Sequence, residues 1–515
     1  MKKLILKGFA VTAIIASLVS CESYDFGSTS DNLNNPSDPL PPSLLTGAQG
    51  SLSGALSLNS TATPSLYVQH LSQTQYTEES RYQTINFNWN ITGSGADPTK
   101  PEATVSLYNK PLQALKTIID INSDPTTKEA MAAYGSNNNQ IAVAKIMWAY
   151  YFQWMTDRWG MLPYTEAFGG VQQPYPKYDS QESIYKDLFD KIDEAVAQMD
   201  GGSGPDGDII FNGNMSQWKK FANTLKMNMA IRLAKVYPSP TGYAATKFNE
   251  AMGGAISSVS ENIMYPCIDN DSFDNPYQDD YVDAGRTDEC LSDVLVDKML
   301  ATNDPRLPMF GEPAESSGTF VGLQYGWADA GSIPNADVSF MNNDLILEST
   351  TSLPMFTYAQ IAFNKAEAVL LGWIPGNAQT YYEEAILASM EQWEVEPIRI
   401  DEIPQPDGTI LEVEVDVYDE YLNRPEVTFD AANAMNQIAE QKWLALFYQP
   451  YEAWAEWRRL DYPVLTPAVD ALTGNSIPVR HAYPSNEPTQ NKVGYDAAVA
   501  AQGTDDLFTK LWWDK

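Results

Sequence analysis

Histidine, basic residues and long apolar runs are all scarce in this chain of 515 residues. It contains two histidines, and 32 basic residues stand against 67 acidic ones, which gives a formal net charge of −35. So few histidines argue against a histidine-based catalytic triad and a multi-histidine zinc site. The negative charge excludes an electrostatic nucleic-acid binder, which needs a basic footprint. After the N-terminal leader no segment approaches about 20 uninterrupted apolar residues, so we expect no permanent membrane-spanning helix.

Cysteine is also rare, and the first of the three cysteines closes a leader-like segment. Lysines near the N-terminus precede an apolar stretch of about a dozen residues, which is too short to span a bilayer. The stretch ends in Leu18-Val19-Ser20-Cys21, which resembles the bacterial lipobox. The pattern predicts a lipoprotein signal peptide over residues 1–20 and an acyl anchor on Cys21. A plain secretory signal, or a terminal helix with an incidental cysteine, is the alternative.

The two remaining cysteines, Cys267 and Cys290, permit two interpretations. They form a disulfide in an oxidising compartment, or they are two buried thiols. The sequence alone leaves both open.

The rest of the chain is divided between a tether and a folded body. Residues 21–43 are rich in Ser, Asn, Asp and Pro and cannot bury enough apolar surface to order themselves, so they are expected to form a lipidated tether. With 43% hydrophobic and 11% aromatic residues, the chain has ample material for a large core. No linker-like stretch interrupts residues 44–515, which predicts one body with irregular insertions.

The regular parts of this body are expected to be helical. Apolar residues at helical spacing through 141–155 predict a buried helix. Asp179 and Glu182 resemble a capping box that opens a second helix, and Ser216 precedes a third. Residues 355–393 predict two helices joined by a tight turn at Pro375-Gly376, with alanines at the crossing, as in a tetratricopeptide unit.

Two stretches lack a helical pattern. Residues 262–345 are dense in Asp, Asn, Gly, Pro and aromatics. Residues 396–428 alternate acids with aliphatic residues, which predicts a strand pair turning at Pro406-Asp407-Gly408. The expected fold is therefore mainly α, a superhelix of tetratricopeptide-like pairs with loop and short-strand insertions, and these insertions are the expected ligand-facing parts.

Catalytic and metal chemistry find little support in the sequence. His70 and His481 are each expected to be surface or capping residues. The acidic cluster Asp269, Asp271, Asp274, Asp279 and Asp280 permits an irregular calcium site, although an EF-hand loop would need Gly at position six and Glu at position twelve. A solvated acidic loop is the simpler interpretation, and we expect no metal and no cofactor.

Aromatic residues interleaved with polar ones in loops are the expected ligand-binding feature. Flat rings suit sugar faces or peptide side chains, and arginine supplies directional hydrogen bonds. The alternative is that several of these rings merely cover the core. The first group, expected on one side of the ligand, is Tyr76, Arg81 and Trp89, and the second is Tyr277, Tyr281, Arg286, Tyr325 and Trp327.

Taken together, several segments resemble the SusD/RagB family, and more closely its SusD-like branch of nutrient-binding outer-membrane lipoproteins of Bacteroidetes. The resemblance runs from Cys21 to Lys515. Besides the lipobox and tether, it rests on DRWGMLPYTEAF, QWKKFANTLKMNMAIRLA, NDPRLPMF, WLALFYQPYEAWAEWRRLDYP and DDLFTKLWWDK.

The resemblance implies a helical body of about four tetratricopeptide-like pairs, tethered at the outer leaflet of the outer membrane and exposed at the cell surface. It also implies a non-enzymatic role in which the protein caps a SusC-type TonB-dependent β-barrel transporter and hands over a glycan, or in some members a peptide. The family's binding residues vary with the nutrient, so none is carried over. Two other functions stay open: a surface glycoside hydrolase using two carboxylates, and a repeat scaffold without a small ligand.

Overall fold

The computed structural model describes residues 39–56, 58–83, 89, 106–270, 273–407 and 409–515. Cys21, the expected signal peptide and most of the expected tether lie outside these residues, as does Asp271. The chain divides into two units, Met1–Leu40 and Pro41–Lys515, and every element named below belongs to the second. None of the helices in the described ranges is both long enough and apolar enough to cross a bilayer.

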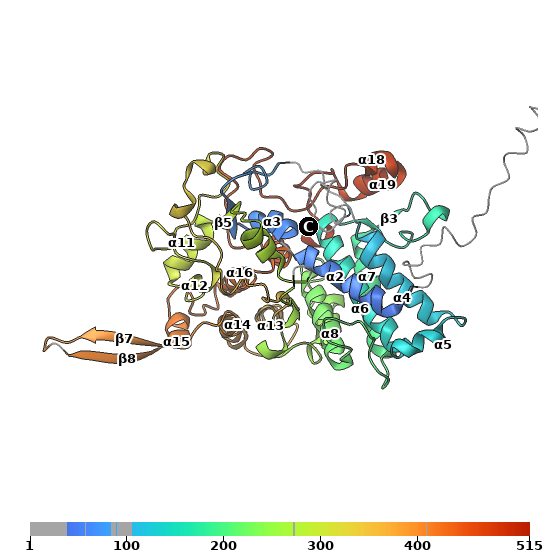
Figure 1. Ribbon diagram of the computed structural model, residues 1–515, viewed down its shortest axis with the longest axis horizontal. Coiled ribbons are helices and arrows are strands. Elements are labelled where there is room, and N and C mark those ends of the chain that lie inside the picture. Colours follow the sequence, from blue (N-terminus) through green and yellow to red (C-terminus); the bar gives the residue numbers. More distant parts are fainter. Residues whose placement is uncertain (1–38, 57, 84–88, 90–105, 271–272, 408) are drawn as a thin grey trace, which may run out of the picture. The chain divides into compact units, whose positions relative to one another are not determined.

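The described body is mainly helical, as predicted (Figure 1). Its α-helices are α2 (Pro41–Leu56), α3 (Leu58–Tyr67), α4 (Gln113–Ser123), α5 (Lys128–Met131), α6 (Asn137–Trp159), α7 (Gln181–Gln198), α8 (Met215–Arg232), α9 (Tyr243–Met252), α10 (Pro276–Gln278), α11 (Asp293–Thr302), α12 (Leu307–Phe310), α13 (Tyr358–Leu370), α14 (Ala378–Gln392), α15 (Val417–Leu422), α16 (Ala434–Ala445), α17 (Pro450–Leu460), α18 (Glu487–Gln490) and α19 (Lys492–Gln502).

The strands are short and pair only two by two. They are β1 (Leu71–Gln73), β2 (Leu162–Pro163), β3 (Tyr178–Asp179), β4 (Ile263–Tyr265), β5 (Glu289–Leu291), β6 (Leu353–Phe356), β7 (Ile398–Pro404) and β8 (Ile410–Asp416). The antiparallel pairs are β1–β5, β2–β3, β4–β6 and β7–β8. The first and third join segments far apart in the chain, whereas β7–β8 is the hairpin predicted within 396–428, and α15 follows it.

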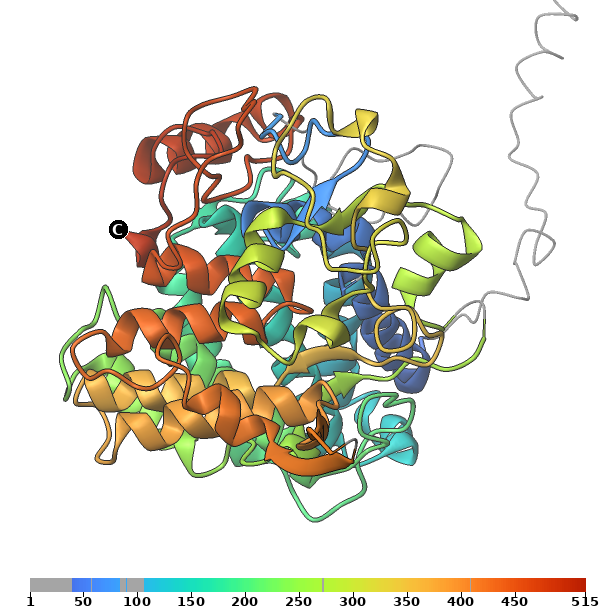
Figure 2. The same cartoon turned by 90° about the vertical axis from the view of Figure 1, so that its left-hand side faces the viewer.

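Four pairs of helices form the tetratricopeptide-like frame, and the two helices of each pair are neighbours in the chain: α6–α7, α8–α9, α13–α14 and α16–α17. In α13–α14 the predicted alanines Ala359, Ala362 and Ala366 are buried, and Gly376 lies in the connecting turn at a positive φ of 145°. Small side chains let the two helices approach closely, which explains why this pair was recognisable from the sequence. Figure 2 looks at the same frame from the side of the β7–β8 hairpin.

Two helix starts differ from the expected ones. α7 begins at Gln181 because Ser180 is its cap, with the Ser180 hydroxyl accepting from the Ser183 amide at 3.1 Å. Asp179 is engaged elsewhere, since its carboxylate accepts from the Thr165 amide at 2.7 Å. α8 is capped by Asn214, which accepts from the amide of Ser216 at 3.1 Å. In both cases a neighbouring side chain satisfies the free amides of the first turn.

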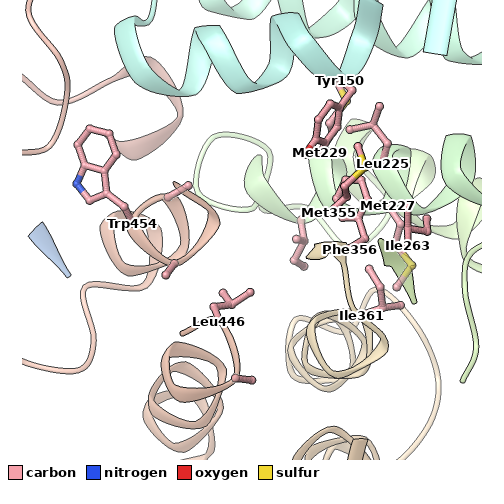
Figure 3. Packing of buried hydrophobic residues seen from close by; sticks show 14 of the residues in the cluster. Tyr150, Leu225, Met227, Met229, Ile263, Met355, Phe356, Ile361, Leu446 and Trp454 are labelled. Atoms are coloured by element: carbon pink, nitrogen blue, oxygen red, sulfur yellow. The ribbon is translucent and has the colours of Figure 1, made fainter. Parts of the chain in front are cut away.

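The apolar core lies where the helix pairs meet (Figure 3). Tyr150 of α6, Leu225 and Met229 of α8, Phe356 of β6 and Ile361 of α13 belong to one cluster, and the Tyr150 and Phe356 ring centroids are 5.8 Å apart. Burial of this set stabilises the frame by roughly 25 cal/mol for each Å² of apolar surface removed from water.

Both histidines lie in this core, which corrects the expectation of surface or capping positions. His70 Nε2 hydrogen-bonds the Trp443 carbonyl oxygen at 3.0 Å, and His481 Nδ1 accepts from Arg158 Nε at 3.2 Å. Burial lowers the pKa of His70 to about 3. For His481, burial and then the neighbouring arginines, Arg158 first, lower the pKa well below its usual value. Each ring is therefore a neutral packing element.

A buried network of charges joins α8, α13, α16 and α17. Glu456 accepts from Arg232 at 2.7 Å, from Arg459 at 2.6 Å and from Lys442, and Arg459 also pairs with Glu367 at 2.6 Å. Burial alone would raise the pKa of Glu456, but the three cations hold it well below its usual range. The frame thus balances its interior charges against one another.

Candidate functional site

Strand pairing brings the two predicted aromatic groups together. In the β1–β5 ladder Ser72 lies opposite Cys290, so the segment that follows β1 runs beside the segment that precedes β5. The pairing continues beyond the strands, because the Thr74 amide donates to the Asp288 carbonyl at 2.8 Å. The Gln75 side chain donates to the Asp288 carboxylate. Asp288 therefore holds both Gln75, the neighbour of Tyr76, and Arg286.

Tyr76 is the most exposed member of the predicted site. Its side chain is 68% exposed, and its backbone has a left-handed φ of 53°. This conformation is uncommon for a residue with a side chain and costs about 1 kcal/mol or more. It is held by the turn that follows, in which the Ser80 amide donates to Gln73 Oε1 at 2.9 Å and the Ser80 hydroxyl donates to the Thr77 carbonyl at 3.0 Å. The ring is presented to solvent by a fixed loop.

Arg286 supplies a cation on the segment that pairs with the Tyr76 loop through Asp288. Its Nε donates to the Asp288 carboxylate at 2.7 Å, and its Nη2 contacts the same oxygen. The hydrogen bond to Asp288 raises the pKa of Arg286 above its ordinary value. Because the side chain is about half exposed, the pair orients the guanidinium without covering it.

A loop from the C-terminal part of the chain connects the other predicted residues. Arg81 Nε donates to the Asp470 carbonyl at 2.9 Å, and the Asp470 amide donates to the Gly326 carbonyl at 3.1 Å. The Asp470 carboxylate accepts from the Ala328 amide at 2.9 Å. Gly326 and Ala328 are the two residues that flank Trp327 in the chain. Asp470 therefore links the loop of Arg81 to the loop of Trp327, which is partly buried on a small cluster with Cys290.

Three predicted tyrosines lie beneath the surface. Tyr277 and Tyr325 are buried, so neither side chain is available to a ligand from solvent. The Tyr277 ring packs on Tyr448 with centroids 4.9 Å apart. Tyr281 donates from its hydroxyl to the Glu289 carbonyl at 2.7 Å and is partly covered. These tyrosines lie between the surface and the core. They fit the alternative interpretation given above, in which several of the loop rings merely cover the core.

Trp89 is placed in a different aromatic cluster. Its indole N–H donates to Glu487 Oε1 at 2.9 Å, and its ring lies against Trp159, Tyr178 and Tyr483 at centroid distances of 5.1, 6.1 and 6.0 Å. Within the described ranges no contact joins it to the loop of Tyr76. The expected grouping of Trp89 with Tyr76 and Arg81 therefore does not appear in the fold.

Two carboxyl groups, those of Glu79 and Glu289, lie close enough to Arg286 to interact with its charge. Glu289 faces Gln73 across the β1–β5 ladder, and the Gln73 amide donates to Glu79 Oε2 at 3.2 Å. Burial, followed by the charges of Glu79 and Asp288, raises the pKa of Glu289 to about 8. Burial likewise raises the pKa of Glu79. Of the two, Glu289 therefore favours its protonated form at neutral pH.

The acidic loop and the cysteines give no catalytic group. The carboxylates of Asp274, Asp279 and Asp283 lie within 4.8 Å of one another, so Asp283 rather than Asp280 joins the predicted cluster. Cys267 and Cys290 are free, buried thiols, which decides between the two interpretations. Burial raises the pKa of Cys267 to about 12, so it is unreactive at neutral pH.

The structure adds polar residues that sequence reasoning missed. Gln75 and Asp288 fix the two halves of the surface, and Asp470 fixes the third segment. Gln75 and Asp288 lie within two positions of the predicted residues Tyr76 and Arg286, and this closeness in sequence was the available signal. Nothing in the irregular sequence around Asp470 indicates its role.

Comparison with known proteins places the chain among outer-membrane proteins. A family model described as "Starch-binding associating with outer membrane" matches residues 33–484. A solved chitin-binding protein is 27% identical, with a TM-score of 0.73, covering 92% of this chain and 100% of its own. A SusD homologue from Bacteroides fragilis is 22% identical, with a TM-score of 0.71 and coverages of 93% and 100%. A chitin-binding SusD homologue from Flavobacterium johnsoniae is 21% identical, with a TM-score of 0.66 and coverages of 91% and 98%. None of the curated proteins matches the chain.

Proposed function

Because the chain belongs to the SusD-like family, we propose that it is an outer-membrane nutrient-binding protein that captures a glycan on the surface around Tyr76. The observation that carries this proposal is the exposed ring on its fixed left-handed loop, together with the guanidinium of Arg286, which is oriented by the same Asp288 that Gln75 bonds. A ring that stacks on a sugar face and an arginine that bonds its hydroxyls suit a ligand that must later be released.

Chitooligosaccharides are the first ligands to test. The 27% identical protein is named as chitin-binding, and a neutral glycan is not repelled by a body of net charge −35. Isothermal titration with chitooligosaccharides, maltooligosaccharides and a mixed peptide set distinguishes the ligand classes. A peptide that binds while every glycan fails would redirect the proposal to peptide uptake.

Tyr76→Ala tests the location of the site. Truncating an anchoring ring should cost about 1–3 kcal/mol of binding free energy. Tyr175→Ala is a matched control, because Tyr175 is 65% exposed and lies outside the segments that form this surface. Equal affinity in the two variants would place the ligand elsewhere. A protein that binds no glycan or peptide yet keeps its protein partners would be a scaffold.

A groove on the helical frame is the competing location for the ligand. It has a volume of about 680 Å³ and is lined by Trp148, Tyr164 and Phe168 together with Lys116, Lys145 and Lys191. Its rings lie mostly in the core, and its lysines are paired with carboxylates, which leaves little to recognise a sugar. Phe168→Ala should leave glycan affinity unchanged.

We assign the protein a non-catalytic role. Burial raises the pKa of Glu289 to about 8, but its side chain is buried and is not presented to a bound sugar. Product release from chitin or starch would overturn this assignment and favour the glycoside hydrolase.

Anchoring and delivery complete the proposal. Cys21 carries the acyl anchor, and the protein hands its ligand to a SusC-type TonB-dependent β-barrel transporter from the outer membrane. Cys21→Ala should release the protein from membranes, measured by fractionation with palmitate labelling. A variant that still sediments with membranes in cells lacking the transporter would contradict the anchor.

A further inference from the structure

The β7–β8 hairpin extends from the frame beyond α15 (Figure 1). Its strands pair in register from Ile398–Asp416 to Pro404–Ile410. Neither strand has a further strand partner in the described part of the chain, so each keeps one open edge. An isolated two-stranded hairpin is marginally stable in water. Open edges are a template for pairing with another chain.

The two faces of the hairpin differ in character. Directly opposed residues share a face, and successive residues alternate between faces. One face therefore combines an ion pair, Arg399–Asp401 at 2.7 Å, with aliphatic side chains. Those aliphatic residues are Ile403, Leu411, Val413 and Val415. The opposite face carries the carboxylates of Glu402, Glu412, Glu414 and Asp416 together with Ile398, Ile400 and Ile410.

The aliphatic residues are unusually open to solvent. Ile403 is 45% exposed and Leu411 is 50% exposed, and on the other face Ile400 and Ile410 are 50% and 59% exposed. Exposed apolar side chains that gather on one small element, unlike ones scattered singly, mark an interaction site. These side chains and the open edges together indicate a docking surface for an extended polypeptide.

Charge decides which polypeptide fits. Residues 396–420 contain nine acids and a single basic residue, Arg399. Two copies of this chain would bring these acids together, and the whole chain carries a net charge of −35, so self-association through the hairpin is opposed. Anionic lipid head groups are repelled for the same reason. The partner must be a different protein that offers Lys or Arg alternating with apolar side chains.

We propose that β7–β8 is a docking ribbon on which an extended basic segment of the SusC-type transporter adds as a further strand. The choice of partner rests on the proposed function. Main-chain hydrogen bonds along an open edge supply affinity in such a complex. Apolar side chains of the added strand lie on the Leu411 face, and its basic side chains lie on the Glu412 face.

The test uses the full-length lipoprotein, tagged and purified from the membranes of its own bacterium. The variant carries Glu402→Lys, Glu412→Lys and Glu414→Lys on the acidic face of the hairpin. The control carries Glu129→Lys, Asp190→Lys and Asp496→Lys, three exposed acids elsewhere. Urea unfolding and oligosaccharide titration establish that both variants keep the fold and the ligand site.

We expect the transporter, identified by mass spectrometry, to co-purify with the wild type and with the control. Its recovery should fall at least about tenfold with the hairpin variant. A photo-crosslinker at Leu411 should attach to the transporter. Equal recovery without a crosslink would overturn the docking ribbon and leave delivery intact. Failure of wild type to recover any transporter would overturn delivery itself, and with it this partner. A hairpin variant that changes the protein's self-association would assign the ribbon to a second copy and contradict the proposal.

Discussion

The helical frame and the surface around Tyr76 both carry charges, but they use them differently. In the frame Glu456 and its three cations are almost fully buried, and Glu456 pairs with all three of them inside the protein. At the surface Arg286 is half exposed and its carboxylate partner Asp288 is buried. Removing one member of a buried set leaves uncompensated charge, whereas the surface pair can exchange protein contacts for ligand contacts.

The same contrast holds for aromatic residues. Trp89 and Tyr76 lie in loops of similar composition, yet Trp89 packs among Trp159, Tyr178 and Tyr483, whereas Tyr76 faces solvent. Composition alone therefore cannot separate a supporting ring from a binding ring. Mutations that affect stability and affinity differently separate them.

The largest effect is expected from Glu456→Gln in the frame. The change leaves Arg232, Lys442 and Arg459 with a weaker partner in a buried site, so the free energy of unfolding should fall by about 3–5 kcal/mol. Urea denaturation measures it. Asp496→Asn, at an exposed pair with Lys492, is the control and should change stability by less than about 1 kcal/mol. Similar losses in the two variants would contradict the difference between frame and surface.

Trp89→Ala should lower stability by about 2–3 kcal/mol, somewhat less than a fully buried tryptophan, because the ring is partly exposed. Glycan affinity of the folded protein should stay unchanged. Both quantities come from urea denaturation and isothermal titration of one preparation. A stable variant with reduced affinity would return Trp89 to the ligand site.

Stability should also depend on the ionisation of Glu289. Its pKa is about 8 in the folded protein and about 4.5 in the unfolded chain, so the folded state holds a proton that the unfolded state releases. Its contribution to stability is fully present below pH 4.5 and is lost as the pH rises to about 8, by up to about 1.4 kcal/mol for each pH unit. Glu289→Gln should remove this slope from a pH series of urea midpoints, and Glu78→Gln should keep it. An unchanged slope in Glu289→Gln would show that the carboxyl ionises normally.

The smallest effect is expected from Arg286→Lys. Lysine keeps a cation beside Asp288 but loses the planar fork of donors, so glycan affinity should fall by about 1 kcal/mol with little change in stability. Titration of the variant against the same oligosaccharide measures the loss. A large drop in unfolding free energy would instead assign Arg286 to the structural support of the β1–β5 ladder.

Local patterns made the frame predictable and left the site only partly so. The small-residue crossing of α13–α14 depends on neighbours in sequence, so its alanines identified it. The cap of α7 lies one residue after the predicted Asp179, because Asp179 bonds Thr165 instead. Trp89 binds Glu487, which is 398 residues away, and no local signal could indicate that contact.

The surface around Tyr76 could likewise be predicted only in part from the sequence. Tyr76, Arg81, Arg286 and Trp327 were named from loop composition, and tertiary pairing does bring their segments together. Asp470, which links the loops of Arg81 and Trp327, lies in an irregular stretch whose sequence gives no sign of this role. Predicting it would require the packing of three loops, which periodicity does not encode.

The short β1–β5 ladder also sets an order of events in time. Next to it, the Thr74 side chain donates to the carbonyl of Thr287, 213 positions away, and Arg81 bonds Asp470, which is 389 positions further along the chain. Contacts over such separations close slowly compared with the local helix pairs. The local helix pairs should therefore form early in folding and the surface around Tyr76 last. An intact surface around Tyr76 is thus a sign that the whole chain has folded, because three segments far apart in the sequence must meet to form it.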